Sequence, residues 1–153
     1  MVLAPVSFKR PESVLVVIFT AANEVLLLRR ADHDAFWQSV TGSLEWHEED
    51  LLAVARRELA EETGIAVSAG WRDWEVSHQY EIFPQWRHKY RPGTERNTEH
   101  VFSVELAARV PVTLQPSEHQ EYVWLDWSKA LSRVTSATNR WALATLGRER
   151  GVV

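Results

Sequence analysis

The sequence contains no cysteine. Disulfides and thiolate metal sites are therefore excluded. An excess of basic residues is also missing, because 17 Lys and Arg face 21 Asp and Glu, which gives a formal net charge of −4. An acidic chain of this kind has no general positive field to attract nucleic acid. We therefore expect no nucleic acid among its partners.

Long apolar runs are absent as well. The longest one, residues 14–22, stops at Asn23, far short of the roughly 20 residues that cross a bilayer. No basic leader followed by an apolar run opens the sequence. With 153 residues, 45% hydrophobic and 25% charged, the composition is typical of one folded domain. We expect a single cytoplasmic domain over residues 1–153, with no membrane partner.

Apolar, β-branched runs bounded by polar turns predict strands, and a 3.6-residue period predicts helices. The first two runs flank a polar turn, which is typical of a hairpin. The predicted strands cover residues 14–19, 25–29, 36–43, 98–106 and 121–127. The predicted helices cover residues 50–62 and about 138–148, the second with Trp141, Leu143 and Leu146 buried. This order predicts the α/β class, with a mixed β-sheet between an early and a late helix.

The early helix carries three glutamates on one side. Glu58, Glu61 and Glu62 lie within about 100° of arc, beside an apolar stripe. The stripe comprises Leu52, Ala55 and Leu59. Like charges at this spacing destabilise a helix by a few tenths of a kcal/mol per pair. A solvated acidic face is the ordinary explanation, but a position beside a buried stripe favours a cleft in which carboxylates bind Mg²⁺ or Mn²⁺.

The residues around this helix resemble the Nudix box. The matching positions are Gly42, Glu49, Arg57, Glu58, Glu61, Glu62 and Gly64. Six residues separate Gly42 from Glu49, where the family has five. Glu48 as the box acid restores five but lengthens the next spacing from seven residues to eight. We prefer Glu49, because a loop tolerates an extra residue, whereas a helix face would rotate by about 100°.

The resemblance implies an α/β/α sandwich that hydrolyses a nucleoside diphosphate linked to another group. It implies a divalent metal cofactor, Mg²⁺ or alternatively Mn²⁺. The metal ligands that it implies are Glu58, Glu62 and Glu118. The catalytic residues that it implies are Glu58, Glu61 and Arg57. Among these, Glu61 completes the metal site or holds the attacking water, and Arg57 orients the box acid and its loop.

Five segments beyond the helix resemble the dihydroneopterin triphosphate pyrophosphatases of folate biosynthesis, which release pyrophosphate and leave dihydroneopterin monophosphate. They read FKRPESVLVVIF, FWQSVTGS, YEIF, RHKYRPGTERNTEH and SEHQEYVWLDW, in that order. The substrate-binding residues that this likeness implies are Lys9, Arg30, Thr41, Tyr80, Glu81, Ile82, Phe83 and Ser136. Glu81 is expected to accept hydrogen bonds from ring N–H groups. Residues 88–99 are expected to form a long ordered loop, which is either a basic surface excursion or a lid that closes over the polyphosphate.

Three alternatives stay open at this point. A Nudix hydrolase of (deoxy)nucleoside triphosphates, including oxidised purines, has the same box and binds a similar flat heterocycle. A catalytically silent Nudix domain would serve as a ligand sensor, although such domains usually lack a box glutamate that this chain retains. A nucleic-acid contact has only the basic, Trp-containing residues 86–96 in its favour. The expected partner is a small molecule, a pterin or nucleoside triphosphate, and the oligomeric state is left open.

Overall fold

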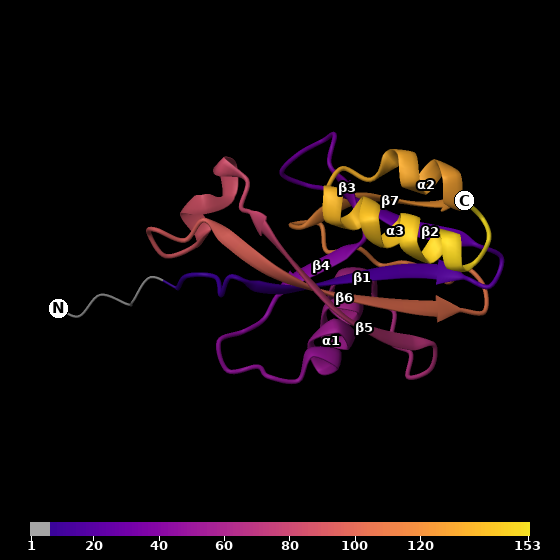
Figure 1. The fold of residues 1–153 in the computed structure, drawn as a ribbon, viewed down its shortest axis with the longest axis horizontal. Coiled ribbons are helices and arrows are strands. Elements are labelled where there is room, and N and C mark those ends of the chain that lie inside the picture. The colour runs from indigo at the N-terminus through magenta and orange to yellow at the C-terminus, as the bar shows by residue number, and fades with distance from the viewer. Residues whose placement is uncertain (1–6) are drawn as a thin grey trace.

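The computed structural model describes residues 7–153, so the first six residues of the predicted domain lie outside it. Within this range one mixed sheet contains seven strands (Figure 1). They are β1 (Glu12–Thr20), β2 (Glu24–Arg30), β3 (Trp37–Gln38), β4 (Val40–Ser43), β5 (Trp71–Glu81), β6 (Arg96–Leu106) and β7 (His119–Asp126). The strand order is β3-β2-β1-β6-β5, with β4 paired to β1 and β7 paired to β2. β6 runs parallel to β1, and the other pairs are antiparallel.

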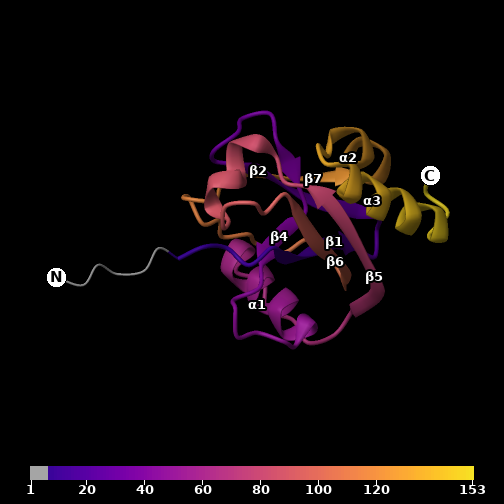
Figure 2. The ribbon, with the colours of Figure 1, turned by 60° about the vertical axis from the view of Figure 1, so that its left-hand side comes forward.

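Helices cover both faces of the sheet (Figures 1 and 2). The helical elements are α1 (Leu51–Thr63), the 3-10 helix η1 (Pro84–Lys89), α2 (Trp127–Arg133) and α3 (Ala137–Glu149). One apolar core lies under α1 and another under α2 and α3. The α/β class and the mixed sheet between helices are confirmed. In the described part of the chain, no helix has both the length and the apolarity that a membrane span requires.

β1 is the central strand, and it buries side chains on both faces. Val14 and Val16 belong to the core under α1, whereas Leu15 and Val17 belong to the core under α2 and α3. A strand covered on both sides has no polar alternation, which explains its continuous apolar run.

The predicted hairpin of β1 and β2 is correct only at its turn. The two strands pair at a single position, Phe19 with Val25. Elsewhere β1 lies between β4 and β6, and β2 pairs with β7 over its whole length. The prediction of one strand over 36–43 is also wrong, because the chain changes partners at Ser39, between β3 and β4. In both cases the prediction failed because β1, β2 and β4 each pair with a segment that is not a neighbour in sequence.

α1 begins and ends within one residue of the prediction. Asp50 caps it by accepting from the backbone N–H of Ala53 at 3.1 Å, and Gly64 ends it at φ 75°. The predicted stripe is partly wrong, because Leu52 is 38% exposed. At about 100° per residue, the buried residues span an arc from Val54 to Thr63, and Glu58 and Glu62 fall inside it. Leu52 points in a similar direction but lies in the first turn of the helix, ahead of the first buried residue.

α3 matches the predicted helix, but one of its predicted core residues is exposed. Leu143 and Leu146 are buried, whereas Trp141 is 37% exposed. Its ring packs edge-on against the rings of Trp74 and His78 from β5. No strand was predicted over most of β5, whose residues alternate between exposed and half-buried and therefore give a weak apolar signal.

Candidate active site

A cavity of about 550 Å³ opens beside α1, at the end of the sheet where the N-terminal segment meets η1. It gathers every residue that the sequence predicted to be catalytic, metal-binding or substrate-binding. These are Lys9, Arg30, Thr41, Arg57, Glu58, Glu61, Glu62, Tyr80, Glu81, Ile82, Phe83, Glu118 and Ser136. The box glycine Gly42 lines it too, whereas Glu49 is not part of its wall and Gly64 has its role at the end of α1. Residues that are distant in sequence thus line one cavity.

Glu58 and Glu62 are each only 7% exposed. The carboxylate of Glu58 lies directly over Gly42 of β4. A Cβ atom at position 42 would approach the Glu58 Cδ to 1.9 Å, so the glycine makes room for this carboxylate. Burial raises the pKa of Glu58 to about 7; Arg57 opposes this increase, and Glu61 and Glu62 add to it. The site therefore holds its acidic charge at a free-energy cost that a bound cation would offset.

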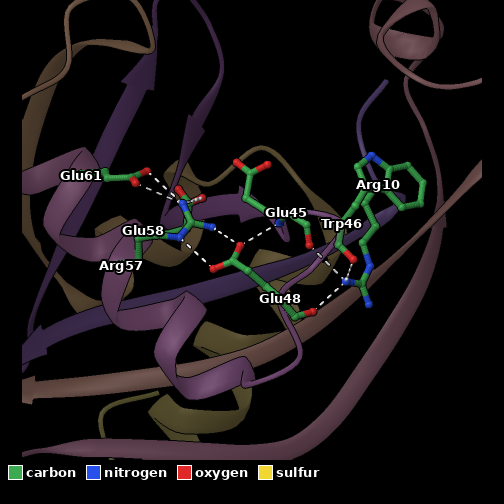
Figure 3. A network of polar contacts seen from close by, with 7 residues as sticks. All are labelled: Arg10, Glu45, Trp46, Glu48, Arg57, Glu58 and Glu61. Atoms are coloured by element: carbon green, nitrogen blue, oxygen red, sulfur yellow. Dashed lines mark hydrogen bonds and ion pairs between the residues drawn. The ribbon is translucent and has the colours of Figure 1, made fainter. Parts of the chain in front are cut away.

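One guanidinium, that of Arg57, holds three of the carboxylates together (Figure 3). Its Nε and Nη2 donate to the two oxygens of Glu48 at 3.0 and 2.6 Å. Its Nη1 donates to Glu58 Oε1 at 3.1 Å and to both oxygens of Glu61, each at 3.1 Å. The hydrogen bonds between Arg57 and Glu48 raise the pKa of Arg57 and lower that of Glu48, and burial opposes both shifts. This cation explains how one helix tolerates its acidic cluster.

The prediction that Glu49 is the acid paired with Arg57 is wrong. Glu48 takes this position, and Glu49 is exposed, with no salt bridge within residues 7–153. Glu49 and the cap Asp50 precede the first helical residue, Leu51. The extra residue between Glu48 and Arg57 is therefore accommodated in a non-helical link, and it does not rotate the face that carries the glutamates.

The loop that carries Glu48 is tied to the N-terminal segment. Arg10 Nη1 donates to three backbone carbonyls of this loop, most closely to that of Glu48 at 2.7 Å (Figure 3). Trp46 Nε1 donates to the carbonyl of Phe8 at 2.8 Å. These contacts fix the loop from outside the box. Arg10 lies outside the Nudix box, and no local pattern predicted this role.

A buried histidine orients Glu62. His119 is 2% exposed, and its Nδ1 lies 2.9 Å from Glu62 Oε2. Gln38 Nε2 lies 3.0 Å from His119 Nε2 and 3.1 Å from Thr41 Oγ1, so its two N–H groups serve these two acceptors. His119 Nε2 is then the acceptor, and Nδ1–H donates to Glu62. The sequence prediction missed His119 because 57 residues separate it from Glu62.

The carboxylates have the donor atoms that a divalent cation requires, but in this structure they are not arranged around a common point. Within residues 7–153, no three His, Asp or Glu side chains converge closely enough to form a ready metal site. Glu58 is bound to Arg57 and Glu62 to His119, while Glu118 is exposed on the loop before β7. Oxygen-only donors, two of them nearly desolvated, are nevertheless the set that Mg²⁺ and Mn²⁺ prefer. The predicted ligand set stays a prediction.

Besides Arg10 and Arg57, the cations Lys9, Arg30 and Lys89 line the same cavity. The pKa of Lys9 is lowered, first by burial and then by the charge of Lys89, with a smaller effect of Arg30. Arg30 donates to both oxygens of Asp32 at 2.8 and 2.9 Å, and its guanidinium lies 4.2 Å from the ring centroid of Trp86. The fork predicted to bind phosphate is thus held by Asp32, whose pKa is lowered to about 2. Lys89 was not predicted.

The end of the cavity near η1 is aromatic. Phe36, Phe83 and Trp86 pack edge to face, with ring centroids 5.3–5.7 Å apart. Tyr80 and Ile82 continue this wall, and Ile82 is 3% exposed. The sequence pointed to Tyr80, Ile82 and Phe83 but not to Phe36 or Trp86.

The remaining substrate predictions fall on residues with structural partners. Thr41 accepts from Gln38, and Ser136 caps α3 by accepting from the N–H of Asn139 at 3.1 Å. The predicted long loop over 88–99 is wrong in part. Residues 84–89 form η1 and β6 begins at Arg96, which leaves a short connection between them.

The NUDIX domain family model matches residues 9–144 of this chain. The dihydroneopterin triphosphate diphosphatase of Escherichia coli K12 is 41% identical over 140 residues, which are 89% of this chain and 91% of that protein. Its namesake from Haemophilus influenzae is 39% identical over 141 residues, which are 89% and 87% of the two chains. The solved E. coli dihydroneopterin triphosphate pyrophosphohydrolase superposes with a TM-score of 0.84 at 40% identity, covering 90% of this chain and 95% of that one.

Proposed function

This chain belongs to the Nudix family of hydrolases, and we propose that it converts dihydroneopterin triphosphate to dihydroneopterin monophosphate and pyrophosphate, a step of folate biosynthesis. The observation that carries the proposal is the cavity itself, which joins a carboxylate cluster, a set of cations and an aromatic wall. A pterin triphosphate has a flat ring that suits the aromatic wall, and phosphates that suit the cations and a metal ion held by the carboxylates. The relatives that share about 40% of their residues with this chain carry the same activity in their names.

Nudix hydrolases use divalent metal ions, and we assign Mg²⁺ here, with Mn²⁺ as a substitute. Glu58, Glu62 and Glu118 are the proposed ligands. When bound, the cation polarises a phosphoryl oxygen and neutralises charge that develops during the displacement. His119 holds Glu62 in place through its Nδ1–H. The buried pair of glutamates favours a cation because each carboxylate has lost most of its contact with water.

Glu61 is the residue that we assign to the attacking water. Its side chain is 49% exposed, so water reaches it from the open side of the cavity. Arg57 Nη1 contacts both of its oxygens at 3.1 Å, which fixes its orientation and leaves lone pairs on each oxygen. A carboxylate held in this way can accept a proton from water as the P–O bond forms. Arg57 is the positioning residue for Glu61 and for Glu48.

The cations of the cavity wall are assigned to the phosphates. The pKa of Lys9 is lowered first by its burial and then by repulsion from Lys89. A polyphosphate between them would remove that repulsion and would accept charge-assisted hydrogen bonds from both. Arg30 can join them by exchanging Asp32 for a phosphate oxygen, because a guanidinium fork fits either anion.

The aromatic wall is assigned to the heterocycle. Phe36, Phe83 and Trp86 present apolar ring surface, and Phe83 is 36% exposed. Flat heterocycles bind to such surfaces by stacking and burial of apolar area. Purine rings are flat heterocycles too, so this wall alone does not separate a pterin from a purine.

The test is pyrophosphate release with Mg²⁺ from dihydroneopterin triphosphate, compared with a panel of deoxynucleoside triphosphates that includes oxidised purines. We expect the pterin to have a kcat/KM at least a hundredfold higher, which corresponds to about 2.7 kcal/mol of transition-state discrimination. A flat profile or a nucleotide preference would refute the pterin assignment and leave the Nudix chemistry intact. Binding without any pyrophosphate release would instead indicate a ligand sensor.

A further inference from the structure

Two hydrogen-bond acceptors in the cavity wall are buried and have no partner in the part of the chain that the structure describes. Glu99 is 3% exposed, and its Oε1 has no hydrogen-bond partner among residues 7–153. Asn97 is 1% exposed, and its Oδ1 has no partner within the same range. The two residues are two positions apart on β6, so they lie on one face of the strand. Both line the cavity described above.

No side chain in the described part of the chain donates a hydrogen bond to Glu99 Oε1 or to Asn97 Oδ1. Asn97 donates its two side-chain N–H groups to Ser13 Oγ at 2.8 Å and to Tyr80 OH at 3.1 Å. Its side-chain oxygen takes part in neither hydrogen bond. No Lys or Arg in the described part of the chain forms an ion pair with Glu99. Burial raises the pKa of Glu99, and only Thr138 opposes this increase. A buried acceptor without a partner costs free energy, so its presence in a cavity wall points to a ligand that donates.

We propose that Glu99 accepts paired hydrogen bonds from the ring N–H and the neighbouring amino group of a 2-amino-4-oxo heterocycle, with Asn97 Oδ1 as an adjacent acceptor. Glu99 is thus a specificity residue for the ring of the substrate. This inference rests on the proposed function in so far as the cavity binds a heterocyclic triphosphate.

The chemistry of the two ring types supports this assignment. Pterins and guanine carry a ring N–H next to an exocyclic amino group, and a carboxylate can accept from both at once. Adenine instead places an acceptor nitrogen beside its amino group, so one carboxylate oxygen would face a lone pair. A site with buried hydrogen-bonding groups rejects a ligand that leaves them unpaired far more strongly than an apolar pocket does. Glu99 therefore favours pterin and guanine rings over adenine.

Glu99 suits this role better than Glu81, to which the sequence assigned contact with ring N–H groups. Glu81 also lines the cavity but is exposed at the end of β5. Water competes for hydrogen bonds at an exposed carboxylate, whereas a desolvated one discriminates between ligands. Both glutamates line the same cavity, but the buried Glu99 is expected to contribute more to ligand discrimination than the exposed Glu81.

The experiment compares the chain with its Glu99→Gln and Glu99→Asp variants on dihydroneopterin triphosphate, dGTP and dATP, with Mg²⁺. The amide directs an N–H group at ring donors, and the shorter acid withdraws its oxygens from them. We expect kcat/KM for the pterin and for dGTP to fall at least tenfold in each variant, while that for dATP changes less than twofold. An equal loss on all three substrates would overturn the proposal, because it would indicate a structural role. No loss on any of them would overturn it equally.

The matched control is Glu105→Gln, which removes a carboxylate from the same strand at an exposed position outside the cavity. It should leave the three kcat/KM values in their original ratios. Thermal melting of every variant identifies any that does not fold, and two different substitutions keep the test decisive if one of them fails. If the unchanged chain hydrolyses dGTP but not the pterin, the proposed function fails, while the dGTP-to-dATP ratio still tests Glu99.

Discussion

Arg57 binds both carboxylate oxygens of Glu48, at 2.6 and 3.0 Å, while Glu49 next to it is exposed. Such a fork is among the stronger ion-pair geometries in proteins. The pair connects the loop after β4 with α1, and the same guanidinium contacts Glu58 and Glu61. The orientation of the acidic cluster thus depends on an acid outside the helix.

Two neighbouring glutamates provide a matched test of this relationship. Glu48→Gln should lower the free energy of unfolding by about 1–3 kcal/mol, because it replaces a charged partner of a half-buried guanidinium. It should also lower kcat/KM at least tenfold through misplacement of Glu61. Glu49→Gln should change stability by less than about 0.5 kcal/mol, as exposed substitutions do. Urea unfolding and pyrophosphate release measure both effects, and an equal effect of the two variants would contradict the assignment of Glu48.

The glycine of β4 is predicted to be essential for activity and not for folding. In Gly42→Ala the new methyl group would lie 1.9 Å from Glu58 Cδ, so the carboxylate must swing away. We expect kcat to fall at least tenfold. The stability cost should stay near 1–2 kcal/mol, because a flexible side-chain end can move. A double-mutant cycle with Glu58→Ala tests whether the clash with Glu58 is the cause, since the stability cost of Gly42→Ala should largely disappear in that background. A cost that persists there would indicate a clash with the backbone instead.

Glu58 should make the metal-free protein less stable as the pH rises. Its pKa is about 7 in the folded chain and 4.5 when unperturbed, so between these values the folded state binds the extra proton. The free energy of unfolding therefore falls from about pH 4.5 to about pH 7, and above that the full penalty, up to about 3 kcal/mol, is present. Glu58→Gln should remove this component and be more stable than the unchanged chain at pH 8. Urea titrations at pH 4.5 and 8 in EDTA measure it, and parallel curves for the two proteins would contradict it.

Glu62 should be required for turnover and for stabilisation by metal. Glu62→Gln keeps the shape of the side chain and an oxygen for His119, so the variant should fold. It lacks the charge that we assign to metal binding, and we expect pyrophosphate release to be abolished. Adding Mg²⁺ at pH 8 should raise the melting temperature of the unchanged chain by mass action and that of the variant much less. Equal activity, or an equal melting shift, would rule out Glu62 as a ligand.

The local elements of the fold were accessible from the sequence because short-range contacts determine them. Asp50 caps α1 through a residue three positions away, and Gly64 ends it because its φ of 75° suits glycine. The Nudix box indicated the glutamates in the same way, by spacing along one helix. The spacing did not show that Glu58 and Glu62 lie inside the buried arc, since that depends on how the helix rests on the sheet.

The sequence by itself determined the α/β class, the family and the acidic helix, each of which follows from residues close together in the chain. The tertiary structure decided which acid pairs with Arg57, because Glu48 and Glu49 are both within reach of it until the loop is fixed by Arg10. It also decided that β1 pairs with β6 and that His119 meets Glu62. Finally, it buried Glu99 with its Oε1 lacking a hydrogen-bond partner in the described chain. Contacts between remote segments form only when the whole core packs, and for that reason no local pattern encodes them.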